Sequence, residues 1–218
     1  KVIQLLDIQQ IAFTVYQYPV SYVELVGTVF GLVAVWLATR QHILTWGLGL
    51  VNIGCFFAIF YQVQLYADML LQVYYLITNL YGWFTWHKQQ QAHQPLAMLT
   101  HLFRLRLAVG ILVGSGLMGW AVAHLHLLLP DVFIQPAAFP YAGAFIAVAS
   151  MAATWLLARR VVENWAIWIA VNVVCIYVYV QQGIILIAIE YVLFLALATY
   201  GLYAWAVMHQ KTKQTPSV

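Results

Sequence analysis

The sequence predicts an all-α integral membrane protein, with seven transmembrane helices in a 3+1+3 arrangement of two parallel three-helix repeats joined by a linker helix. Its composition is the first reason. Hydrophobic residues make up 65% of the chain and charged residues 7%, and the mean hydropathy is +0.87. So little polar surface cannot cover a water-soluble globule. The spacing of its apolar segments and an internal repeat are the other two reasons.

Seven apolar segments are long enough to cross a bilayer, which takes roughly 20 residues in a helix. Helices are expected because lipid cannot satisfy an open backbone, and the alternating ten-residue strands of a membrane barrel are absent. The predicted spans are 22–39, 44–63, 65–86, 105–129, 138–158, 162–181 and 184–208.

The internal repeat has a period of about 119 residues, the separation of Trp36 from Trp155. A repeat of this length made of apolar segments is typical of transporters with two similar halves. The matched pairs include Arg40 with Arg159, Trp46 with Trp165, Tyr81 with Tyr200, Gly82 with Gly201, and Trp86 with Trp205; after a one-residue slip, Asn52 matches Asn172 and Cys55 matches Cys175.

Three helices per repeat leave each copy ending on the side opposite to its start. A second copy in the same orientation therefore requires one more crossing, which the span 105–129 supplies. The predicted parts are an N-terminal interfacial segment (1–20), the first repeat (21–88), the cytoplasmic lead-in and linker helix (89–130), the second repeat (131–210) and a cytoplasmic tail (211–218).

The first segment, Val2 to Pro19, is apolar but interrupted by Asp7 and by several glutamines. This mixture favours an amphipathic helix on the membrane surface. A cleaved signal peptide is the alternative, although no basic n-region or small-residue cleavage site supports it.

Basic residues give the orientation. Eight of the nine Lys and Arg residues fall on one side of the predicted topology, and Lys1 alone falls on the other. The positive-inside rule places that basic side, with the C-terminus, in the cytoplasm and the N-terminus outside. We expect a multi-pass membrane protein with this orientation.

The third span carries a polar stripe. Asp68, Gln72, Tyr75 and Asn79 recur at i, i+4, i+7 and i+11, so all four lie on one helix face. Such a face avoids lipid and meets a partner or a cavity. Hydrogen bonds that hold the bundle together are one explanation; a substrate cavity is the other, and we favour it because the stripe is three turns long.

The sixth span presents Trp165, Trp168 and Asn172 at helical spacing. Trp165 lies near the basic end, where an interfacial anchor and a ligand-binding ring are both reasonable. Trp168 and Asn172 lie deeper, where binding is favoured. In the seventh span, Glu190 and Phe194 share a face; Glu190 and Asp68 are candidates for binding or for helix N-terminal positions in reach of water.

These candidate residues limit the substrate. They offer aromatic faces, amides, hydroxyls and carboxylates, while no Lys or Arg lies in the middle of a span. Anionic substrates need cationic partners. A neutral or cationic ring that carries hydroxyls fits by stacking, cation–π attraction and hydrogen bonding. A nucleoside-like molecule has this chemistry.

Other classes are disfavoured. No catalytic residues, metal ligands or cofactors are predicted, because the nucleophile and zinc motifs are missing. A retinal protein needs a lysine inside its last helix, and Lys211 and Lys213 lie beyond it. We expect no enzyme and no nucleic-acid partner. A membrane receptor or scaffold is the rival class.

The 3+1+3 plan, the Trp-x-x-Trp-x-x-x-Asn pattern of Trp165, Trp168 and Asn172, and the polar third span together resemble the PnuC family of bacterial vitamin transporters, over roughly residues 20–210. The resemblance implies facilitated diffusion of nicotinamide riboside, trapping by a cytosolic riboside kinase for NAD synthesis, a homotrimer, and a fold related to the SWEET sugar transporters.

The repeats differ at the sites of interest: Trp168 aligns with Leu48, and Glu190 has no acidic counterpart. An asymmetric ligand would require such differences. Relatives in the resembled family carry riboflavin or thiamine, and those vitamins, or a sugar, remain alternatives to the riboside.

Overall fold

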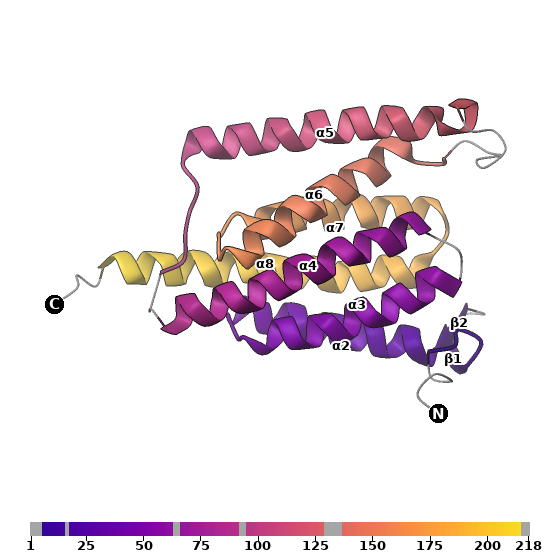
Figure 1. Cartoon of the computed structure of the whole chain (residues 1–218), viewed down its shortest axis with the longest axis horizontal. Coiled ribbons are helices and arrows are strands. Elements are labelled where there is room, and N and C mark those ends of the chain that lie inside the picture. The colour runs from indigo at the N-terminus through magenta and orange to yellow at the C-terminus, as the bar shows by residue number, and fades with distance from the viewer. Residues whose placement is uncertain (1–5, 16–17, 63–65, 92–94, 129–136, 215–218) are drawn as a thin grey trace. The chain divides into compact units, whose positions relative to one another are not determined.

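The computed structural model describes residues 6–15, 18–62, 66–91, 95–128 and 137–214. Figure 1 shows helices along nearly the whole chain, preceded by a short hairpin of strands. The elements are β1 (Ile11–Val15), β2 (Tyr18–Ser21), α2 (Tyr22–Thr39), α3 (Leu44–Gln62), α4 (Tyr66–Gln91), α5 (His101–Leu128), α6 (Pro140–Ala158), α7 (Asn164–Gln181) and α8 (Ile185–Gln214).

Six of these seven helices, all except α4, are apolar and long enough to span a membrane. The predicted helical membrane fold is confirmed, and the order of three helices, one helix and three helices is compatible with the 3+1+3 plan. With 26 residues, α4 is long enough to cross. Its polar stripe lowers its hydropathy.

The linker helix α5 begins at His101, four residues before the predicted start. Thr100 explains the earlier start. Its backbone carbonyl accepts from the Arg104 N–H at 3.0 Å, and its Oγ1 accepts from the Phe103 N–H at 3.4 Å. A Thr in this position satisfies donors that the first helical turn leaves open.

The N-terminal segment differs from the prediction. In place of an amphipathic helix over Val2 to Pro19, β1 and β2 pair antiparallel, with Val15 opposite Tyr18 and Thr14 opposite Pro19. β1 reads Ile-Ala-Phe-Thr-Val, whose β-branched and aromatic residues favour a strand. Pro19 cannot donate to a ladder, but an edge strand tolerates it. The helix prediction was wrong over this hairpin.

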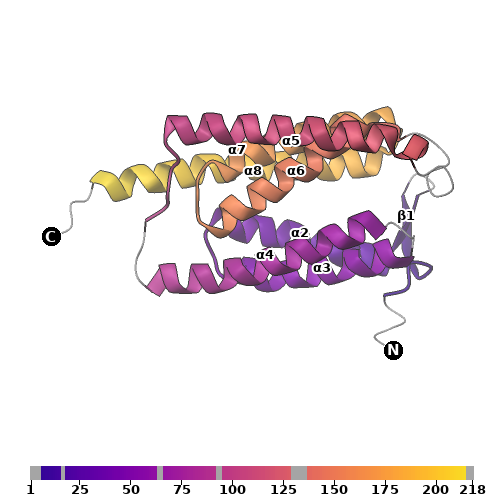
Figure 2. The same ribbon diagram turned by 45° about the horizontal axis from the view of Figure 1, so that its top comes forward.

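The chain forms two compact units, and each is described by itself. The first contains Lys1–Pro95, Ala158–Arg160 and Tyr203–Val218; the second contains Leu96–Leu157 and Val161–Leu202. In the first unit α3 packs between α2 and α4 (Figure 1). In the second unit α5 runs along α6 and α7 (Figure 2), where Ile111, Ala149 and Val171 share a buried cluster. The repeat boundaries proposed from sequence stay a prediction.

Equivalent turns connect the first two helices of each repeat. Gln41 and Arg160 occupy matched positions and share a left-handed backbone, with φ of 55° and 57°. The residue after each closes the same backbone hydrogen bond at 3.0 Å; the pairs are His42 N–H to the Leu37 carbonyl, and Val161 N–H to the Leu156 carbonyl. This conformation is uncommon for residues other than glycine, so its recurrence is a structural trace of the repeat.

A tryptophan packed on a glycine also recurs. Trp46 at the start of α3 covers Gly82 of α4, and Trp165 at the start of α7 covers Gly201 of α8. A Cβ added at Gly201 would lie 2.6 Å from Trp165 Cδ2, and one at Gly82 would meet the Trp46 ring at least as closely. Only glycine lets these rings approach, as is common where membrane helices pack closely.

We expect Gly82→Ala to lower the free energy of unfolding by about 1–3 kcal/mol, because the added methyl overpacks the buried Trp46 ring. Gly54→Ala is the matched control, since a Cβ there meets nothing within 4 Å. The measurement is thermal unfolding of both variants in detergent. Equal melting temperatures would show that the Trp46 ring adjusts at no cost.

Candidate substrate-binding residues

The polar stripe of α4 lies in the first unit and faces its interior. Gln72 and Asn79 are each 8% exposed, and Tyr75 between them is half-buried. Asp68 belongs to the first turn of α4, and its side chain lies outside the described residues. Two buried amides and a phenol therefore follow one face of this helix, as the spacing predicts.

Asn79 lies in a notch made by a glycine. A Cβ added at Gly49 of α3 would be 2.5 Å from Asn79 Nδ2, so the amide occupies space that any other residue would fill. Its Oδ1 is buried and has no hydrogen-bond partner among the described residues. A buried acceptor without a partner is costly, at about 1–3 kcal/mol. A water or a ligand donor would remove that cost.

The first repeat has a second buried amide with a different role. Asn52 of α3 donates through Nδ2 to the Gly27 carbonyl of α2 at 2.8 Å. This amide therefore holds two helices together by a hydrogen bond, which is the role that the sequence left open for the α4 stripe. Its counterpart in the second repeat, Asn172 of α7, is 4% exposed.

The aromatic residues of α7 have unequal environments. Trp165 is 1% exposed and covers Gly201, which is packing of the kind that Trp46 repeats. Trp168 is half-buried and packs against the cluster that contains Val171 and Cys175. Part of the Trp168 ring is therefore open to contact.

On α8, Glu190 and Phe194 are both half-buried. Between them lies Tyr191, to which sequence reasoning gave no role. Its ring stacks on Tyr179 of α7 with centroids 5.4 Å apart and 15° between the planes, and its centroid is 6.1 Å from that of Phe194. The i, i+3 spacing of Tyr191 and Phe194 was the available signal.

The structure therefore places the predicted residues in two groups. Gln72, Tyr75 and Asn79 belong to the first unit on α4; the others belong to the second unit, on α7 and α8, and are Trp165, Trp168, Asn172, Glu190 and Phe194. Within each unit, the group follows the helix faces that the spacing predicts.

Charged groups gather at the ends of the helices. The Glu163 carboxylate accepts from the Arg104 guanidinium at 2.7 Å and from the Leu99 N–H at 3.1 Å, which ties the lead-in of α5 to the turn before α7. In the first unit the Arg160 guanidinium donates to the Gln41 side chain. Burial lowers the pKa of that guanidinium below its ordinary value, although an arginine remains charged at any ordinary pH.

Within the described residues, no group of three or more His, Cys, Asp or Glu side chains could hold a metal ion. Cys55 and Cys175 are buried as free thiols.

Most of the chain is similar to known membrane transporters. Residues 21–207 match the model of the family described as "Nicotinamide mononucleotide transporter". The nicotinamide riboside transporter PnuC of Escherichia coli strain K12 is 31% identical over 208 residues, which cover 86% of each chain. The riboflavin/roseoflavin transporter RibM of Streptomyces davaonensis is 25% identical over 201 residues, which cover 89% of each chain.

The fold has a counterpart among solved structures. The crystal structure of the vitamin B3 transporter PnuC superposes with a TM-score of 0.66 at 21% identity, covering 87% of this chain and 83% of that one. The seven helices, the spans and the sequence match over most of the chain lead to one conclusion. This multi-pass membrane protein belongs to the nicotinamide mononucleotide transporter family, in which the PnuC transporters are its relatives.

Proposed function

We propose that this protein carries nicotinamide riboside across the membrane by facilitated diffusion. Its relative in Escherichia coli bears that substrate in its name and is 31% identical over 86% of the chain. The chain is then a transporter with no chemical step of its own. Metabolic trapping by a cytosolic riboside kinase would make the import directional.

The observation that carries this proposal is the buried Asn79 Oδ1, which has no hydrogen-bond partner in the described part of the chain. It lies beside Gly49, on the same helix face as Gln72. A primary amide offers two donors and an acceptor, which suit a carboxamide or the hydroxyls of a ribose. We propose that Gln72, Tyr75 and Asn79 contact the substrate by hydrogen bonds. Asp68 belongs to the same stripe and is proposed with them.

In the second unit the candidate residues offer aromatic rings as well as polar groups. We propose Trp168 as the stacking partner of the pyridinium ring, because its ring is half-buried rather than enclosed. Asn172, Glu190 and Phe194 are proposed as further contacts. Trp165 is proposed as a rigid wall, since its 1% exposure leaves little of the ring for direct stacking.

Riboside is favoured over mononucleotide, although the family description names the latter. In the described helices, every Lys and Arg lies in the first or last two turns, as Lys88 of α4 and Arg106 of α5 do. A phosphate moved to the middle of the membrane would lose water without gaining a cation.

Riboflavin is the second candidate, because RibM is 25% identical over 89% of the chain. Its ring system is also aromatic and its side chain is also hydroxylated, so stacking and amide contacts serve it as well. The positive charge of the riboside's pyridinium ring separates the two candidates. Cation–π attraction to Trp168 and charge attraction to the carboxylates both favour the riboside.

Location, orientation and assembly complete the proposal. We place the protein in a bacterial inner membrane with its N-terminus outside and its C-terminus in the cytoplasm, on the positive-inside rule. A homotrimer is proposed from the family resemblance. No histidine or paired carboxylate lies in mid-membrane in the sequence, so we propose transport without proton coupling.

The test is calorimetric titration of the purified protein with riboside, riboflavin and thiamine, together with riboside counterflow in proteoliposomes. Tight riboside binding and counterflow without an ion gradient support the proposal. Binding of riboflavin alone would transfer the function to the second candidate, and ligand binding without counterflow would favour a receptor.

We expect the phosphorylated riboside to bind far more weakly than the riboside, by at least about 2 kcal/mol, because its phosphate would be desolvated without a cationic partner. Calorimetry against both ligands in one buffer measures the difference. Equal affinities would contradict an uncharged binding site.

We expect Trp168→Ala to weaken riboside binding by about 1–3 kcal/mol, the range for a base stacked on an aromatic ring. Trp120→Ala is the matched control, since Trp120 is an exposed residue of α5. Affinity of the wild-type level in a folded Trp168→Ala protein would make Trp168 a packing residue.

We expect Asn79→Leu and Gln72→Leu to lower riboside affinity by about 1–3 kcal/mol with little change in melting temperature. Asn52→Leu is the opposite control, because Asn52 holds the Gly27 carbonyl and its loss should lower the melting temperature. Gly49→Ala should imitate Asn79→Leu by displacing the flexible amide.

These variants separate binding from packing by a paired readout of affinity and melting temperature. If Asn79→Leu unfolds at a much lower temperature and the folded fraction binds riboside normally, Asn79 is a structural residue that holds helices together. The binding residues would then be those of α7 and α8 alone.

A further inference from the structure

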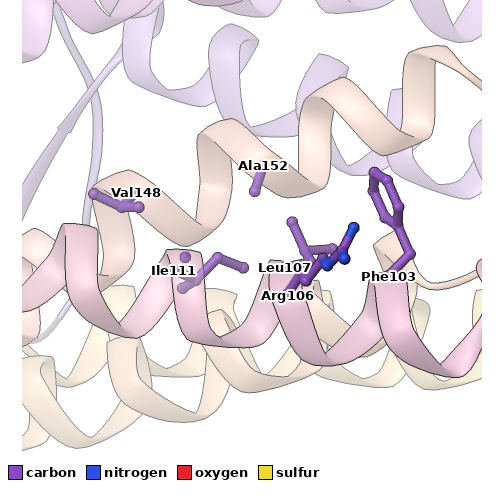
Figure 3. A pocket seen from close by; sticks show the side chains of 7 residues that line it. Phe103, Arg106, Leu107, Ile111, Val148 and Ala152 are labelled. Atoms are coloured by element: carbon purple, nitrogen blue, oxygen red, sulfur yellow. The ribbon is translucent and has the colours of Figure 1, made fainter.

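A groove opens between α5 and α6 in the second unit, and none of the residues proposed to bind substrate lines it. Its volume is about 390 Å³. Figure 3 shows Val148 and Ala152 of α6 across from Phe103, Leu107 and Ile111 of α5, with Arg106 beside them. The lining is apolar except for that one guanidinium. This volume lies within the range of roughly 300–1,000 Å³ that small-molecule sites occupy.

A glycine keeps the groove open. Gly110 lines it one turn beyond Arg106, and a Cβ added there would meet no atom within 4 Å. Neighbouring faces of α5 are exposed and apolar: Leu105, Val109 and Leu112 are among the exposed large side chains of this spanning helix. The groove therefore belongs to a surface that faces hydrocarbon.

Arg106 differs from its neighbour Arg104 in having no carboxylate. Arg104 is neutralised by Glu163, whereas Arg106 is exposed and has no hydrogen bond or ion pair in the described part of the chain. It lies in the second turn of α5, about 7.5 Å from the first residue at 1.5 Å per residue. An arginine at that depth extends its head toward the membrane interface.

From this geometry we propose a phospholipid site. An anionic phospholipid places an acyl chain in the groove over Gly110, and its phosphate accepts hydrogen bonds from the Arg106 guanidinium. Basic groups beside membrane helices attract anionic headgroups on the cytoplasmic side, and guanidinium matches phosphate geometry.

A second copy of the chain is a poorer occupant on charge grounds. In the orientation predicted from the basic residues, Glu163 is the one acidic residue of the sequence that falls on the cytoplasmic side. Arg104 already neutralises it. A neighbouring copy would therefore bring no free anion to Arg106 at this depth, while a lipid phosphate supplies one.

The experiment is native mass spectrometry of the full-length protein in detergent, titrated with phosphatidylglycerol or with phosphatidylcholine. The wild type should bind phosphatidylglycerol in preference. Arg106→Gln should weaken phosphatidylglycerol binding about fivefold, the effect of one basic group near an anionic surface. It should leave phosphatidylcholine binding unchanged, and Arg106→Lys should retain most of the preference.

Gly110→Leu fills the groove and should reduce binding of both lipids. Gly116→Leu is the matched control on the same helix, because a Cβ at Gly116 also meets nothing within 4 Å but the residue does not line the groove. Arg106→Gln keeps the test decisive even if Gly110→Leu does not fold, since Arg106 is exposed.

Three results would overturn the proposal. One is equal phosphatidylglycerol affinity for the wild type and Arg106→Gln. Another is full competition by inorganic phosphate at the same concentration, which would identify a phosphate site without a lipid. The third is a change of oligomeric mass in Gly110→Leu with lipid binding intact, which would assign the groove to a second copy. Riboside binding is independent of all three.

Discussion

The close packing of a tryptophan ring on a glycine is the contact on which the two repeats depend. Lipid offers no hydrophobic drive between helices, so van der Waals contact must hold them together. Trp46 on Gly82, and Trp165 on Gly201, join the second and third helices of each repeat near one end. In the first unit the same end is closed by Trp205, whose Nε1 donates to the last carbonyls of α2. With these ends fixed, α4 holds its polar face toward α3.

On this shared scaffold the repeats differ in their polar atoms. The Asn52 amide donates to the Gly27 carbonyl. Leu48 occupies the position that corresponds to Trp168 in the second repeat. Glu163 anchors the linker helix through Arg104 and has a leucine, Leu44, as its counterpart. The packing residues repeat because the helices of both halves must be held together by van der Waals contact in lipid. The proposed binding residues lie among these departures from symmetry, as a single asymmetric ligand would require.

The sequence was informative wherever a feature repeats along one helix. The length of the apolar segments located the spans, and helical periodicity located the α4 stripe. The 119-residue spacing matched the left-handed turns at Gln41 and Arg160. It was uninformative about the hairpin, because five residues of β1 are too few for alternation to outweigh the glutamines around them. It could not locate the notch for Asn79 in Gly49 or the stacking of Tyr191 on Tyr179. Those contacts join different helices, and no spacing within one helix encodes them.

Asn79 Oδ1 is buried and has no hydrogen-bond partner among the described residues. A ligand donor that reached such an acceptor would gain in affinity the cost, about 1–3 kcal/mol, of leaving it unpaired. That cost limits how many such groups a bundle can hold. Asn52 differs, because its amide already donates to the Gly27 carbonyl within the protein. Amides also do not titrate, so binding through them does not require a proton to move. A carrier that binds its substrate in this way releases it wherever the free concentration falls. Under the proposed facilitated diffusion, the direction of net transport depends on what happens to the substrate after release.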